Sequence, residues 1–151
     1  MGDFGTVAAL VCAATWAVAL CIYDFRWQRL PNFLTLPAAA GAVVAAALWA
    51  PEALWGLAWP LLYVALALAQ PHGAVGGGDI KLAATLGPVV QWVGGFLAVV
   101  LAIGCAAALT LVGAVGWHLV VRTSRVARGG IPHGPSMIIA TVSVMAAVLM
   151  A

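Results

Sequence analysis

The chain has 151 residues, of which 66% are hydrophobic and only 7% are charged, which is the composition of a membrane protein and excludes an ordinary soluble domain. Its formal net charge of +2 comes from six basic and four acidic residues, too few for the extended basic face that nucleic-acid binding needs. No polar segment is long enough to form a separate soluble domain, so we expect one integral membrane domain over residues 1–151.

Polar breaks divide the chain into six apolar segments, each of which is expected to be a helix. The first, residues 4–23, has no basic region before it and no processing site after it, so it is read as a retained helix. The others cover residues 33–50, 53–70, 79–91, 93–121 and 132–150. The segment 79–91 is shorter than the roughly 20 residues that cross hydrocarbon, so it must tilt, lie beside a thinned bilayer or span only part of it. The sequence thus predicts an all-α integral membrane protein, a polytopic bundle of about six transmembrane helices with one short member.

The charged residues indicate how these helices are oriented. If six segments cross, loops 24–32, 71–78 and 122–131 share one side of the membrane. That side carries all the basic residues, and the other side carries Asp3 and Glu52. The positive-inside rule therefore assigns the basic side to the cytoplasm. The basic residues are Arg26, Arg29, Lys81, Arg122, Arg125 and Arg128.

Tryptophans also mark the predicted segment ends, where an indole ring prefers the lipid headgroup region. Those expected at this interface are Trp27, Trp49, Trp55, Trp59 and Trp92, whereas Trp16 and Trp117 are expected to be packing residues.

Neither the cysteines nor the histidines have the spacing of a metal site. The cysteines lie in apolar runs without Cys-x-x-Cys pairs and are expected to be buried small hydrophobes. The histidines have no ligand spacing and no nearby nucleophile, so they are not expected to take part in the chemistry. We therefore predict no metal. The residues concerned are Cys12, Cys21, Cys105, His72, His118 and His133.

Asp24 and Asp79 are the candidate catalytic residues. Taken singly, Asp24 could be an interfacial carboxylate neutralised by Arg26 or Arg29, and Asp79 could be an N-cap of the helix it precedes. Together they place two carboxylates at one membrane face, the minimum equipment of an aspartic protease. Two close carboxylates cannot both ionise cheaply, so they would share a proton and act as an acid–base pair.

Three glycines, Gly76, Gly77 and Gly78, directly precede Asp79. They could be a flexible loop, but they also allow close backbone approach and positive φ. A protease must hold an extended peptide, and a glycine-rich edge offers main-chain groups for strand addition. We therefore expect these glycines to help bind substrate.

These motifs resemble the type IV prepilin peptidase family. The chain has Gly-x-Gly-Asp at residues 76–79, followed by Ile-Lys-Leu, and its earlier acid precedes Leu-Pro-Asn-Phe-Leu-Thr at residues 30–35. A third match, residues 131–135, is similar to the Pro-aromatic-Gly-Pro element that opens the last helix of that family, with His133 at the aromatic position. The resemblance covers roughly residues 20–140, and the motifs are in family order.

The resemblance implies an intramembrane aspartic endopeptidase that removes the leader from prepilin or pseudopilin precursors, cutting after a glycine at the cytoplasmic boundary of a prokaryotic inner membrane. The chain lacks room for the cytoplasmic region that larger members use for methylation, so it is most similar to the short, peptidase-only enzymes of Flp or tight-adherence pili. No cofactor is implied: neither zinc nor S-adenosylmethionine. The positions that match the motifs, and are expected to position substrate or the acids, are Pro31, Asn32, Lys81, Pro132, Gly134 and Pro135.

Two other readings remain open. A presenilin or signal-peptide-peptidase type enzyme also pairs an Asp after Tyr with Gly-x-Gly-Asp, although its acids lie within the membrane segments of a larger bundle. A small transporter or proton-coupled membrane protein could use Asp24 and Asp79 as a proton relay, for which acids nearer the bilayer midplane are expected. The depth of the two carboxylates, and whether they share a face, distinguishes these readings.

Overall fold

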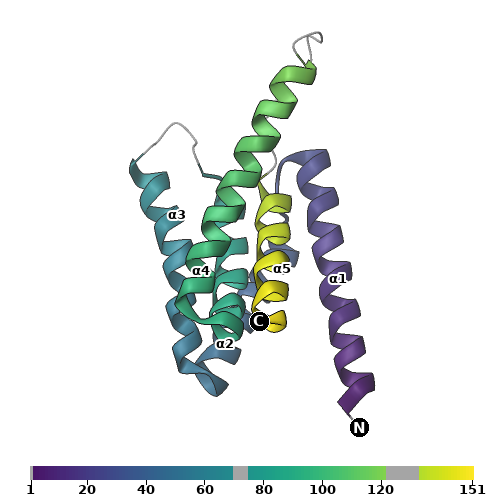
Figure 1. The fold of residues 1–151 in the computed structure, drawn as a ribbon, viewed down its shortest axis with the longest axis vertical. Helices are drawn as coiled ribbons and strands as arrows, with labels where there is room; N and C mark the ends of the chain where they lie inside the picture. The colour runs from purple at the N-terminus through teal and green to yellow at the C-terminus, as the bar shows by residue number, and fades with distance from the viewer. Residues whose placement is uncertain (1, 70–74, 122–132) are drawn as a thin grey trace.

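The computed structural model describes residues 2–69, 75–121 and 133–151, and every element in these ranges is a helix. The predicted all-α class is therefore confirmed. Figure 1 shows the elements as an upright bundle with both chain termini at one end. They are α1 (Gly2–Trp27), α2 (Asn32–Trp49), the 3-10 helix η1 (Pro51–Leu57), α3 (Ala58–Ala69), α4 (Gly77–Val121) and α5 (Gly134–Met150).

Helix α4 is broken at Gly95, which has φ 69° and ψ −173°. The break that the sequence suggested between residues 91 and 93 is present but lies at Gly95, because the helix continues through Gln91 and Trp92. Gly95 can adopt the positive φ that a residue with a Cβ rarely takes. The two arms of α4 run antiparallel, since residues near its start and residues 107–114 line the same cavity. The first arm, residues 77–94, is about 27 Å long, longer than the short helix predicted there.

The third predicted segment begins as the 3-10 helix η1 and only then becomes the α-helix α3. Pro60 lies in the first turn of α3, where a missing N–H is tolerated because first-turn amides have no partner within the helix. The 3-10 geometry of residues 51–57 also brings Gly56 against Gly87 of α4, where a Cβ on either glycine would overlap the backbone of the other.

The core lies around α4, which contacts α2, η1, α3 and α5, while α1 packs mainly on α5. Figure 1 shows α1 at the side of the bundle, next to α5. Trp59 is fully buried in this core, so its predicted position at the lipid headgroups is wrong. Trp16 is a packing residue as predicted, because its Nε1–H donates to the Leu34 carbonyl of α2 at 3.0 Å.

Four described stretches have the length and hydropathy of membrane spans, and α5 is apolar but shorter at 17 residues. The spans are Phe4–Trp27, Asn32–Trp49, Pro51–Ala69 and Gly77–Gly116, the last including both arms of α4. The chain is thus a multi-pass membrane protein; that six segments cross stays a prediction.

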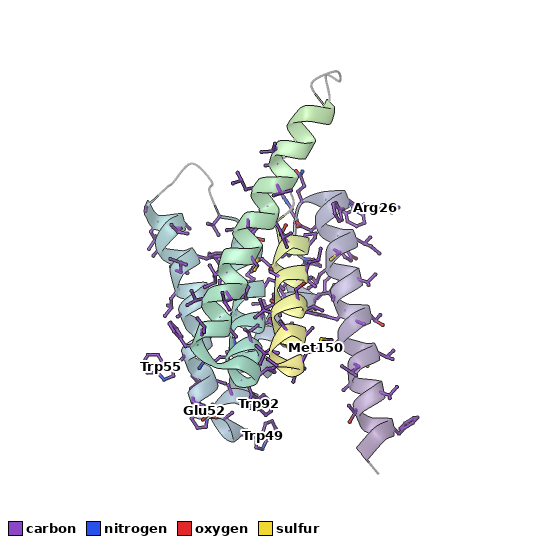
Figure 2. The ribbon with its side chains drawn as sticks, in the orientation of Figure 1. Arg26, Trp49, Glu52, Trp55, Trp92 and Met150 are labelled. Atoms are coloured by element: carbon purple, nitrogen blue, oxygen red, sulfur yellow. The ribbon has the colours of Figure 1, made fainter. Side chains whose placement is uncertain are left out.

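Arg26 and Glu52 lie at opposite ends of the bundle, as predicted. Figure 2 shows Arg26 at one end, and Glu52 with Trp49, Trp55 and Trp92 at the other. The end with Arg26 is also the end at which α1 finishes and α5 begins. It is there that the candidate site is found.

Candidate active site

Asp24 and Asp79 line the same cavity, of about 990 Å³, at the end of the bundle that carries Arg26. Its walls come from the end of α1, residues 75–79, the second arm of α4, α3 and His133 at the start of α5. The two acids are 55 positions apart (79 − 24) in the sequence. They share a cavity because α1 ends and α4 begins at the same end of the bundle.

Asp24 lies in the last turn of α1, and its side chain is only 6% exposed. The helix stops after Trp27 because Gln28 takes a left-handed φ of 50°, with its N–H donating to the Asp24 carbonyl at 2.9 Å. The Asp24 carboxylate accepts a hydrogen bond at Oδ2 from the Gly134 N–H of α5, also at 2.9 Å. Within the described residues no ion pair joins Asp24 to Arg26 or Arg29, so the reading of a carboxylate neutralised in its own loop does not hold.

Asp79 lies in the first turn of α4, two residues after the helix begins, and is therefore not its N-cap. Its backbone N–H donates to the Gly76 carbonyl at 3.0 Å. The N-terminal end of a helix stabilises a negative charge, which favours a carboxylate at this position. The side chain is half-buried and close enough to Asp24 for the two charges to interact.

The three glycines before Asp79 all line the cavity, but only one of them is sterically required by a neighbouring segment. A Cβ on Gly78 would lie 2.9 Å from the Cβ of Leu30, whereas a Cβ on Gly77 would have no heavy atom within 4 Å. A Cβ on Gly76 would be 3.3 Å from Oδ2 of Asp79. Gly78 thus allows the start of α4 to approach the loop after Asp24.

The other residues expected to position substrate or the acids fall into two groups. Lys81 and Asn32 bond to each other, with Nζ donating to Oδ1 at 2.6 Å, and this exposed contact links α4 to the start of α2. Pro31 caps α2, and its carbonyl accepts the N–H groups of residues 34 and 35. These three residues brace the segments beside the cavity and do not line it.

The last motif lies at the start of α5, where Gly134 and Pro135 are buried. Gly134 touches Asp24 directly, since a Cβ on it would lie 3.0 Å from Oδ2. Pro132 lies outside the described residues.

Reasoning from the sequence missed two cavity residues, Tyr63 of α3 and Thr110 of α4, and expected no part in the chemistry for a third, His133. His133 Nε2 is 2.7 Å from the Tyr63 hydroxyl, and its Nδ1 is 2.6 Å from the Thr110 hydroxyl. Tyr63 and Thr110 lie in apolar runs where nothing in the spacing distinguishes them from packing residues. Burial lowers the pKa of His133 below its usual 6.5, so the ring is neutral at neutral pH.

The cysteines do not contribute to the cavity. Cys12 and Cys105 are exposed on the outer face of the bundle and Cys21 is half-buried, so the expectation that all three are buried is wrong. Among the described residues no three His, Cys, Asp or Glu side chains cluster as metal ligands.

Two carboxylates in one partly desolvated cavity can exchange a proton with a water and with a carbonyl oxygen. Both acids lie within a turn of a helix end, on one face of the bundle. A proton relay through the bilayer would need acids nearer the midplane, and a protease model fails if the acids are on opposite faces. The arrangement therefore favours peptide hydrolysis.

Comparison with known proteins also indicates a peptidase. The model of the type IV leader peptidase family matches residues 11–112, which include both acids. Leader peptidase HopD of Salmonella typhimurium is 30% identical over 146 residues, and the alignment covers 91% of each chain. No solved structure matches the chain.

Proposed function

The chain belongs to the type IV leader peptidase family, and from that premise we propose that it is an aspartic endopeptidase with Asp24 and Asp79 as its catalytic pair. The observation that carries the proposal is that these two acids, from distant parts of the sequence, line one cavity. Arg29 is the only other charged residue in the described lining. A cavity lined by two carboxylates favours acid–base activation of water.

In the proposed reaction the two carboxylates share one proton, because both cannot ionise cheaply at short range. The ionised member draws a proton from water as the water attacks the peptide carbonyl carbon. The protonated member donates to the carbonyl oxygen. The Gly134 amide donates to Oδ2 of Asp24, so the water or the shared proton is assigned to Oδ1.

We further propose that the substrates are prepilin or pseudopilin precursors anchored in the lipid bilayer, cut after a glycine at the cytoplasmic boundary. Gly76 and Gly77 are exposed beside Asp79. The Gly76 carbonyl already accepts the Asp79 N–H, so the group offered to an extended peptide is the Gly77 N–H, which has no acceptor within the first turn of α4. The loops near the site carry more basic than acidic residues, and prepilin leaders are basic as well. Substrate recognition is therefore assigned to packing of the substrate helix and to the small glycine at the cut.

The proposed setting is the inner membrane of a prokaryote, with the cavity facing the cytoplasm. Two features support this orientation: the cavity end carries Arg26, and Glu52 lies at the other end (Figure 2). Residues 1–151 are proposed to be a single peptidase domain that does not methylate its product and that needs neither a metal nor a cofactor.

The test is co-expression with a candidate prepilin, with cleavage read as a mobility shift and confirmed by mass spectrometry. Asp24→Asn and Asp79→Asn should each leave the precursor uncut. Glu52→Gln removes an exposed carboxylate at the opposite end of the bundle and should process normally. Normal processing by either aspartate variant would refute the catalytic assignment.

A further inference from the structure

His133 connects three helices at the point where α5 begins. Its two ring nitrogens lie within hydrogen-bond distance of hydroxyls on two other helices, Tyr63 on α3 and Thr110 on the second arm of α4. Tyr63 in turn packs against Trp59 in an edge-to-face contact, with the ring centroids 6.3 Å apart. His133 is thus fixed on both edges of its ring, in the wall of the cavity that contains both acids.

The protons of this network can be assigned by counting donors. A threonine hydroxyl has one proton, and that of Thr110 is directed to the Ala106 carbonyl at 2.9 Å. With its proton assigned to that bond, Thr110 accepts from His133, and the ring proton is assigned to Nδ1. In a neutral imidazole the other nitrogen is then an acceptor, so the Tyr63 hydroxyl donates to Nε2.

The next residue along the chain connects this network to the acids. The Gly134 N–H that binds Asp24 Oδ2 belongs to the peptide group formed with the His133 carbonyl. A peptide group is planar, so fixing His133 also fixes the direction of that N–H. The His133 carbonyl is held as well, because it accepts the Met137 N–H at 3.2 Å.

We propose that His133, locked as its Nδ1–H tautomer between Thr110 and Tyr63, is a positioning residue that aims the Gly134 amide at Asp24. It acts on the reaction through Asp24 and not by contact with the substrate. This inference deepens the proposed function, and its effect on turnover rests on that function. The tautomer does not, so it can be tested separately.

The first test is 15N NMR of histidine-labelled full-length protein in nanodiscs, with the other two histidines replaced by Gln for assignment. The wild type should show protonated Nδ1 and unprotonated Nε2. Thr110→Val removes the acceptor and should move the proton to Nε2, which can then donate to the Tyr63 hydroxyl. Thr15→Val is the matched control, because Thr15 makes the same backbone bond, to the Val11 carbonyl at 2.8 Å, on the exposed side of α1. It should leave the histidine spectrum unchanged.

Two results of this test would overturn the inference: an Nε2–H tautomer in the wild type, or a spectrum that Thr110→Val does not change. Tyr63→Phe keeps the test decisive if Thr110→Val does not fold. It removes only the donor to Nε2, so Nδ1 should stay protonated, and a change of tautomer there would also count against the assignment.

The second test is cleavage kinetics on a purified prepilin. His133→Ala should lower kcat about tenfold, the usual scale for losing a residue that orients a functional group, with KM changed less than about twofold. His133→Asn should recover part of the loss, because its amide nitrogen can occupy the place of Nδ1–H and donate to Thr110.

The kinetic outcomes separate the two proposals. Wild-type kcat in His133→Ala, with Asp24→Asn inactive, would refute the positioning role and leave the protease assignment intact. A rise in KM with kcat unchanged would also refute it, since that is the effect of a substrate contact. Normal cleavage by Asp24→Asn would refute the proposed function itself, whatever tautomer the spectra show.

Discussion

Replacing Gly78 with alanine tests whether close contact between the start of α4 and the loop after α1 sets the geometry of the two acids. The added Cβ would lie 2.9 Å from the Leu30 Cβ and 3.3 Å from its Cγ. Ordinary contact begins at 3.4 Å, so the two segments must move apart, by 0.5 Å (3.4 − 2.9) if they are to reach it. No rotamer change relieves the first overlap, because a Cβ moves only with its backbone, and Leu30 is further restricted as the residue before Pro31.

This separation has a cost in stability and a cost in rate. Overpacking of this kind typically costs about 1–3 kcal/mol. Asp79 is the next residue, so the shift is passed directly to its carboxylate. Misplacing a reacting group by about 1 Å can cost about a hundredfold, so a shift of half that size is expected to lower kcat roughly tenfold.

The assay is prepilin cleavage by purified protein, with thermal unfolding measured in parallel. Gly104→Ala is the matched control: it is a glycine of the same helix that does not line the cavity, and its Cβ would have no heavy atom within 4 Å. It should cleave at the wild-type rate and unfold at the same or a higher temperature, because alanine favours a helix. Equal rates for the two alanine variants would refute the argument that this contact sets the position of Asp79.

Three further predictions concern other parts of the chain. Gly87→Ala should lower the free energy of unfolding by about 1–3 kcal/mol, because its Cβ would overlap the Gly56 carbonyl; unchanged thermal unfolding would contradict that contact. Lys81→Ala and Asn32→Ala should each lower the free energy of unfolding by less than about 1.5 kcal/mol. The double variant should lose no more than either single variant, because one exposed hydrogen bond joins the two side chains. Additive losses would mean that the two side chains act separately. Burial lowers the pKa of His133, so the unfolded chain binds more protons than the folded chain as the pH falls below about 6.5, and the free energy of unfolding should decline there. The free energy of unfolding of His133→Phe should decline less between about pH 7.5 and 5. Identical pH profiles for the two proteins would contradict this.

The sequence was sufficient to predict that the two acids lie at the same end of the bundle. Polar breaks in an apolar chain indicate helix ends, and the placement of basic residues indicates which ends share a face, so the juxtaposition of Asp24 and Asp79 follows without any knowledge of packing. The same reasoning could not tell that Asp24 is held by the Gly134 amide, because that bond spans 110 residues.

The features that were missed depend on conformation or on packing between helices. Gly95 breaks α4 through a positive φ, whereas the more polar Gln91, where the break was expected, is compatible with a helix. Trp59 is a core residue because η1 and α3 turn it inward, although its position near a segment end is typical of an interfacial indole. Thr110 has the pattern of a helical threonine bonding its own backbone, and only the tertiary fold brings it to His133.

The central claim, that Asp24 and Asp79 act as one acid–base unit, is tested most directly by measuring kcat/KM on a purified prepilin for Asp24→Asn, Asp79→Asn and the double variant. If the pair shares a proton, loss of either member abolishes the unit, so each single variant should lose about a thousandfold or more. The double variant should then be no slower than the slower single variant. Effects that multiply in the double variant, or a wild-type rate in either single variant, would contradict the account.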